Sequence, residues 1–70
     1  MRQVILYQDE DGVWIAEVPS LPGCGSDGAT EEEALDNVRD AIQLWINDAI
    51  AHGEPIPEDY PVEIRAVEIA

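Results

Sequence analysis

With 70 residues, the chain is long enough for one domain, 1–70, with a single small core, and too short for a second domain. It carries 16 acidic residues against three arginines and no lysine, and a net charge of -13 repels phosphate backbones and anionic lipid. Composition therefore excludes nucleic acid and membrane surfaces as first hypotheses for a ligand, and it favours a basic protein partner.

Cys24 is the only cysteine, so no disulfide can form within the chain, whereas small secreted domains normally contain several. The N-terminal residues MRQVILYQ hold too short an apolar run for a signal peptide or a membrane span. We therefore expect a cytoplasmic protein. Because a chain of this size buries only about 60% of its unfolded surface, we also expect a homo-oligomer, a dimer or a tetramer.

Two N-terminal segments have the composition of β-strands. Residues 3–8 and 13–18 are rich in β-branched and aromatic side chains. The intervening DEDG suits a tight turn with a positive φ at Gly12. We predict an antiparallel hairpin.

Apolar side chains point to both faces of this predicted hairpin. In the first strand, Val4 and Leu6 point one way while Ile5 and Tyr7 point the other. One helix can cover only one face, so we expect another chain to bury part of the second. Trp14, in the second strand, is a candidate anchor for that contact.

The segment PSLPGC interrupts the strand pattern. Prolines cannot donate to a ladder, so the chain leaves the sheet at Pro19 and can return for a short third strand near residues 24–26. We expect Pro22 and Gly23 to set the shape of this loop and Cys24 to be a small buried thiol.

Thr30 and Glu33 form a capping-box pattern, which predicts the start of a helix. Apolar residues then recur at helical spacing until His52, and Gly53 is a conventional stop. The sequence predicts one long amphipathic helix packed on the sheet. Leu44 lies on its polar side and is therefore a second candidate for contact with a partner.

The last run, VEIRAVEI at residues 62–69, alternates apolar and charged side chains until its phase shifts at Ala66 and Val67. We predict a C-terminal strand. The order is then strand, strand, short strand, helix and strand, which places the fold in the α+β class.

No group of residues predicts catalysis, a cofactor or a metal. The loop glycines lack phosphate-loop spacing, and residues 31–33, all glutamate, crowd the helix N-terminus where an anion would sit. Cys24 has no neighbouring base, since the only histidine, His52, lies at the far end of the helix. The carboxylates of DEDG are more simply a solvated turn than a cation site.

Residues 11–46 resemble the HicB-type antitoxins of bacterial toxin–antitoxin systems. Three motifs carry the resemblance in order and spacing: an acidic-glycine turn before Trp14, Pro-x-Leu-Pro-Gly-Cys at 19–24, and Thr-x-Glu-Glu-Ala-Leu-x-Asn at 30–37. The resemblance implies a partial, degenerate ribonuclease-H-like fold without nuclease activity. It also implies that the protein neutralises a small, basic HicA-type toxin, which cleaves mRNA.

Many such antitoxins also carry a C-terminal DNA-binding segment. Here the sequence stops directly after the last predicted strand, so we expect no separate DNA-binding domain.

Three functions stay open. The first is an antitoxin that contacts its toxin through Trp14, Glu17 and Leu44. The second is a residual metal-dependent nuclease that uses carboxylates such as Asp9, Asp11 and Glu17. The third is a solitary regulatory or scaffold domain, whose open sheet face serves only self-assembly.

Overall fold

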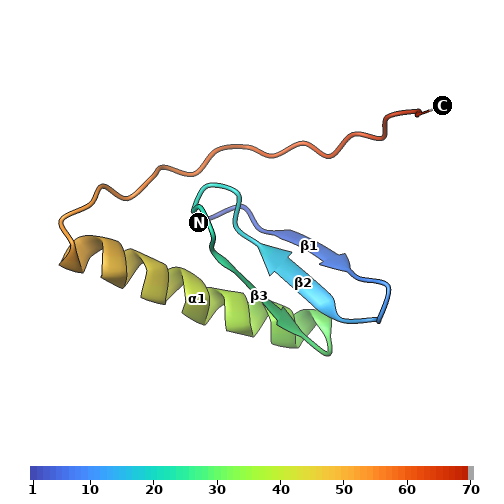
Figure 1. Ribbon diagram of the computed structural model, residues 1–70, viewed down its shortest axis with the longest axis horizontal. Helices are drawn as coiled ribbons and strands as arrows, with labels where there is room; N and C mark the ends of the chain where they lie inside the picture. The colour runs from blue at the N-terminus through green and yellow to red at the C-terminus, as the bar shows by residue number, and fades with distance from the viewer. Residues whose placement is uncertain (70) are drawn as a thin grey trace.

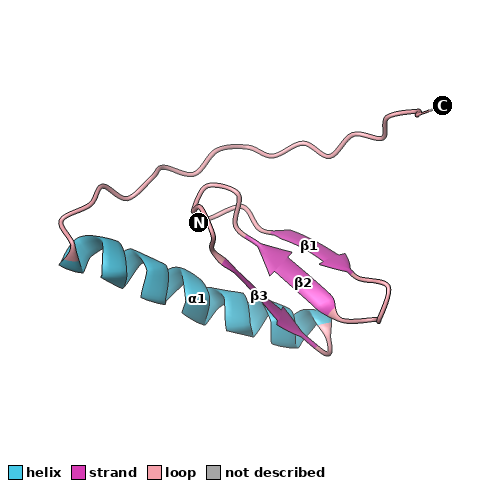
Figure 2. Ribbon diagram, in the orientation of Figure 1, coloured by secondary structure: helices cyan, strands magenta, loops and turns pink. Residues whose placement is uncertain are grey.

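The structure is a computed structural model that describes residues 1–69. A three-stranded antiparallel sheet packs one face against a single long helix (Figures 1 and 2). Its elements are β1 (Ile5–Gln8), β2 (Trp14–Glu17), β3 (Gly25–Gly28) and α1 (Glu31–Ala51). The predicted α+β class is confirmed. The ribonuclease-H-like detail stays a prediction.

β1 and β2 form the predicted hairpin, with Leu6 opposite Ala16. The turn between them is fixed by Asp9, whose Oδ1 accepts from the backbone N–H groups of Asp11 at 2.9 Å and Val13 at 3.0 Å. Gly12 adopts the predicted positive φ, at 85°. The Asp9 carboxylate therefore serves the turn, as short polar side chains commonly do.

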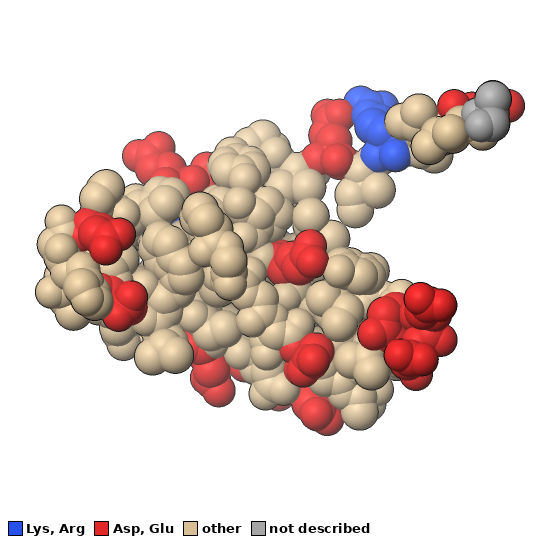
Figure 3. Space-filling model, in the orientation of Figure 1, with Lys and Arg blue, Asp and Glu red and all other residues tan. Residues whose placement is uncertain are grey.

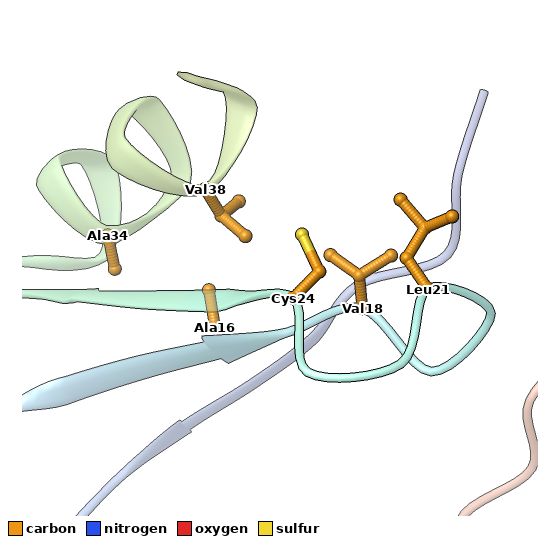
Figure 4. Close-up of a cluster of buried hydrophobic side chains, with 6 residues drawn as sticks. All are labelled: Ala16, Val18, Leu21, Cys24, Ala34 and Val38. Carbon is orange, nitrogen blue, oxygen red and sulfur yellow. The ribbon is translucent and has the colours of Figure 1, made fainter. Parts of the chain in front are cut away.

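The core lies between the sheet and α1. Figure 4 shows helix side chains pointing toward side chains of β2 and of the loop that follows it; the buried cluster comprises Ala16, Val18, Leu21, Cys24, Ala34 and Val38. Trp45 packs partly buried against this cluster, in agreement with its place in the apolar stripe of the helix.

The helix starts and stops where the sequence predicts. Thr30 Oγ1 accepts from the Glu33 N–H at 3.1 Å, which satisfies one of the free donors of the first turn. At the other end, Gly53 has φ 66°. Before the helix, Gly28 lies so close to it that an added Cβ would come within 2.5 Å of the Ala34 backbone nitrogen. Only glycine permits this approach.

The third strand spans Gly25–Gly28 and so lies slightly later than the predicted 24–26. It pairs with β2, which leaves its other edge facing α1. There the Asn37 side-chain amide donates to the Asp27 carbonyl at 2.8 Å. A helix side chain thus satisfies part of the free edge of β3.

The C-terminal strand predicted for residues 62–69 is absent from the structure. Residues 54–69 pair with no strand in the described part of the chain, and Figure 1 shows them running past the sheet as an extended segment. The prediction was wrong for this chain on its own because alternation supplies side-chain faces but not the neighbouring strand that a ladder needs. None of the helices in residues 1–69 has the length and apolarity to cross a membrane.

Candidate protein-binding surface

The sheet face turned away from α1 is partly apolar. Because side chains alternate along a strand, Leu6 and Ala16 face the helix, and their neighbours face the other way. This open face carries Ile5, Tyr7, Ile15 and Glu17. The two isoleucines are half-buried, and Tyr7 is 42% exposed. The predicted apolar character of both sheet faces is confirmed.

On the open face, the Tyr7 hydroxyl donates a hydrogen bond to Glu17 Oε1 at 2.9 Å. That bond raises the pKa of Tyr7, and partial desolvation and the negative charges of Glu17 and Asp9 act in the same direction. The phenol therefore remains a donor at neutral pH. It holds the carboxylate of Glu17 across the strands.

Two shallow hollows share the loop segment 23–25. One, of about 400 Å³, is bounded on the helix side by Ala41, Leu44, Trp45 and Asp48. The other, of about 470 Å³, is bounded on the sheet side by Ile5, Glu17, Val18 and Pro19. Glu17 and Leu44, both predicted as partner contacts, thus lie on either side of one loop. We name this region the loop-flanking surface: Glu17, residues 23–25, Leu44, Trp45 and Asp48.

Two features make the loop-flanking surface a candidate contact site. Leu44 is 72% exposed although it is a large apolar side chain. Next to it, the Trp45 indole N–H donates to the Pro22 carbonyl at 3.0 Å, which ties the loop to α1. The surface therefore combines an accessible leucine with a loop whose position is fixed.

Trp14, the third predicted contact, lies elsewhere. It pairs with Gly28 at the opposite end of β2, packs half-buried against the core, and borders neither hollow. The structure therefore brings Glu17 and Leu44 to one surface and leaves Trp14 apart from it. A contact between Trp14 and a partner stays a prediction.

The loop motif is structural. The Val18 N–H donates to the Cys24 carbonyl and the Cys24 N–H to the Leu21 carbonyl, each at 3.0 Å, while Gly23 has φ 75°. Cys24 is buried, as predicted, and desolvation raises the pKa of its thiol. The thiol is therefore protonated at neutral pH and packs as a small apolar group.

Two of the three carboxylates considered for a residual nuclease, those of Asp9 and Glu17, have other tasks. Asp9 accepts hydrogen bonds within its own turn, and Glu17 accepts one from Tyr7. Across the described residues 1–69, no three histidine, cysteine or acidic side chains assemble into a group that could hold a metal ion.

The sequence did not reveal how the C-terminal segment is attached. Asp59 accepts from the Gln3 N–H, at 3.0 Å to Oδ1 and 3.1 Å to Oδ2, and its Oδ1 accepts from the Ser20 hydroxyl at 3.1 Å. The Tyr60 hydroxyl donates to the Pro19 carbonyl at 2.6 Å. No local pattern could signal these contacts, because the bonded residues lie 39 to 56 positions apart.

The Asp59 contacts favour its charged form. The Gln3 N–H lowers the pKa of Asp59 most, and desolvation opposes it. The Ser20 hydroxyl, the Tyr60 N–H and the charge of Arg2 lower the pKa further. Elsewhere the surface is strongly acidic: Figure 3 shows acidic side chains spread over the visible face, and a basic side chain in the C-terminal segment.

Comparison with known proteins gives consistent matches. The model of a family described as "HicB_like antitoxin of bacterial toxin-antitoxin system" matches residues 3–68. A UPF0150 protein of Thermoplasma acidophilum is 46% identical over 61 residues, which are 87% of this chain and 88% of the relative. One from Synechocystis is 43% identical over 56 residues, covering 80% and 71%. A 14.9 kDa protein of Haemophilus phage HP1 is 36% identical over 60 residues, or 86% of this chain and 44% of the phage protein.

Proposed function

Since the chain belongs to the HicB-like antitoxin family of bacterial toxin–antitoxin systems, we propose that it neutralises a small, basic HicA-type toxin that cleaves mRNA. Family membership makes it a non-enzymatic regulatory protein with a toxin as its partner. In the proposal, the antitoxin works in the cytoplasm as a homo-oligomer. It covers the face of the toxin that binds and cleaves RNA.

The loop-flanking surface carries this proposal. It places an exposed leucine, Leu44, and two carboxylates, Glu17 and Asp48, around a loop that Trp45 holds in place. An RNA-binding toxin must present a cationic face, and a protein with net charge -13 attracts such a face over long range. The carboxylates then replace RNA phosphates as partners of the cationic side chains.

Charge alone would give fast but salt-sensitive binding. Apolar contacts slow dissociation, because their free energy comes from surface removed from water rather than from screened charges. We therefore assign Leu44 to the lifetime of the complex and Glu17 to its rate of formation. Trp14, from the far end of β2, is proposed as a peripheral contact.

The experiment is calorimetric titration of the protein with the toxin encoded beside it, using two matched variants of α1. Leu44→Ser removes the leucine of the loop-flanking surface, and Ile50→Ser removes an isoleucine that is 62% exposed but borders neither hollow. Burial of a leucine side chain contributes about 1.5–3 kcal/mol, so Leu44→Ser should weaken binding at least about tenfold. Ile50→Ser should leave the affinity unchanged. Equal effects of the two variants would remove the loop-flanking surface from the proposal.

A second candidate, a solitary scaffold or regulatory domain, is favoured by the apolar open face and by the exposed C-terminal segment. In that case the same surfaces serve self-assembly alone. The neighbouring gene discriminates the two: a small, strongly basic protein encoded next to this one supports the antitoxin, and its absence supports the scaffold.

A further inference from the structure

The C-terminal segment holds apolar side chains that nothing covers. Ile64, Val67 and Ile69 are 80%, 76% and 86% exposed. Hydrogen bonds of Asp59 and Tyr60 attach the base of the segment, which then runs outward beside the body of the molecule (Figures 1 and 3). Three large apolar side chains on one short extended segment are typical of a strand that is buried in an assembly.

The outer edge of β1 offers the matching backbone. The Asp9 N–H donates to the Val13 carbonyl at 2.9 Å, which fixes which residues of the hairpin exchange hydrogen bonds. Since bonded and non-bonded pairs alternate in an antiparallel ladder, the backbone groups of Leu6 and Gln8 point away from β2. They form the outer edge of the sheet, because β1 is its terminal strand.

The opposite edge of the sheet is less available. On β3, the same alternation turns the Asp27 backbone outward, and its carbonyl already accepts the hydrogen bond from Asn37. Of the two edges, β1 is therefore the one on which a further strand can form a ladder.

A hollow beside residues 1–4, which lead into β1, matches the side chains of such a strand. It has a volume of about 430 Å³, and its apolar walls include Val4, Leu35, Val38 and Ile42. A strand that is added to β1 and extends past Ile5 toward Val4 projects alternate side chains toward α1, where this hollow lies. In the C-terminal segment, Val62, Ile64 and Ala66 share one face, and after the phase shift Val67 and Ile69 fall on the other.

We propose that residues 62–69 of one copy add as a strand to the outer edge of β1 in a second copy, with reciprocal exchange between the two. The inference rests on the homo-oligomer of the proposed function and names its interface. Val62 and Ile64 fill the hollow beside Val4, while Val67 and Ile69 extend the open face.

The occupant is a second copy because of how the segment leaves its own body. Asp59 and Tyr60 fix its base, and the following residues run outward without pairing to the β1 of the same chain. Eight residues of strand span about 26 Å, which is enough to cover the whole of β1. In a reciprocal exchange, the C-terminal segment of each copy pairs with the β1 edge of the other copy, so both β1 edges are occupied and the assembly closes as a dimer. It also supplies the ladder partner that residues 62–69 lack in one chain.

The first test measures mass by sedimentation velocity on full-length variants. Arg65→Pro and Ala66→Pro each remove one backbone donor, and since successive donors point to opposite edges of a strand, one of them must face β1. We expect the variant whose missing donor faces β1 to raise the dimer dissociation constant about tenfold or more. The control Arg65→Ala removes the side chain but keeps the donor, and it should stay dimeric like the wild type. A monomeric wild type would overturn both the exchange and the homo-oligomer.

The second test identifies the occupant. Isotope-labelled and unlabelled chains are mixed, and nuclear Overhauser effects between Ile64 of one chain and Val4 or Leu35 of the other are recorded. Intermolecular effects support the exchange. A dimer without them, or effects confined to one chain, would overturn it and leave self-association standing. Neither result depends on toxin inhibition, which is measured separately and can fail while the exchanged dimer is intact.

Discussion

The indole N–H of Trp45 donates a hydrogen bond to the backbone carbonyl of Pro22 at 3.0 Å, and this bond joins the middle of α1 to the loop between β2 and β3. It fixes the loop beside Leu44 and thus shapes the loop-flanking surface. The bond also explains why a tryptophan in the apolar stripe of the helix is only partly buried. Its ring packs on the core while its polar edge reaches the loop.

Trp45→Phe keeps most of the ring but removes the donor. We expect a loss of about 1 kcal/mol in the free energy of unfolding, because the net contribution of one such hydrogen bond is of that size. Urea denaturation measures it. The variant should also bind the toxin more weakly, because the hydrogen bond that holds the loop beside Leu44 is missing. The small loss of stability alone would leave the protein folded and would not reduce toxin binding. Unchanged toxin affinity would show that the position of the loop does not matter for binding.

Gly28→Ala should lower the free energy of unfolding far more than Gly53→Ala does. At Gly28 the added Cβ would meet the start of α1 at 2.5 Å, so the helix must move away from the sheet. At Gly53 no atom lies near the new Cβ, and the cost is only the left-handed backbone, about 1 kcal/mol. Thermal unfolding of the two variants compares the effects. Similar melting temperatures would mean that β3 does not pack as closely on α1 as the structure shows.

Glu17→Gln should lower the pKa of Tyr7 toward the ordinary 10.0, because the bond to the carboxylate is the main cause of its elevation. A raised phenol pKa stabilises the folded state at pH values below the pKa of Tyr7 in the unfolded chain. This stabilisation is lost as pH rises through the pKa of Tyr7 in the folded protein. Carbon-13 NMR titration of the Tyr7 ring measures the shift. An unaltered Tyr7 pKa in Glu17→Gln would contradict the hydrogen bond.

The anchoring of the C-terminal segment should depend on pH in the acid range. The pKa of Asp59 is held below its ordinary 3.8, chiefly by the Gln3 N–H. The contribution of Asp59 to the free energy of unfolding is therefore complete above pH 3.8. It is lost as pH falls through the lower pKa that Asp59 has in the folded protein. The protection factor of the Gln3 amide hydrogen should fall over that range, and Asp59→Ala should show the low protection at neutral pH as well. Equal protection of Gln3 in the wild type and Asp59→Ala would exclude the anchor.

The rate of toxin binding should fall as salt is raised, while the dissociation rate changes little. Steering by the net charge of -13 is screened beyond roughly 8–10 Å at physiological ionic strength, whereas the proposed Leu44 contact is apolar. Stopped-flow mixing at several salt concentrations separates the two rates. An association rate that ignores salt would remove electrostatic steering from the mechanism.

Sequence reasoning succeeded where the signal is local. Gly12 marks the hairpin turn, and Thr30 and Gly53 mark the ends of the helix, since turn and cap residues act within a few positions of the chain. Leu44 was identified from helical periodicity alone and is exposed as predicted. These features needed no knowledge of the tertiary fold.

The remaining features depend on residues far apart in the chain. The bonds from Gln3 to Asp59 and from Trp45 to Pro22 join separate segments, so no spacing rule reveals them. Trp14 was ambiguous because both faces of its strand are apolar, and only the packing of α1 decides that it faces the core. The strand predicted at 62–69 failed for the same reason: its alternating side chains are a local signal, but no strand within residues 1–69 pairs with it.

RNA cleavage by the purified neighbouring toxin, measured with increasing amounts of this protein, tests whether the protein occludes the toxin. Occlusion predicts that cleavage stops once every toxin molecule is bound, and that Leu44→Ser needs a higher concentration for the same effect. Undiminished cleavage at saturating concentrations of the wild-type protein would rule out occlusion.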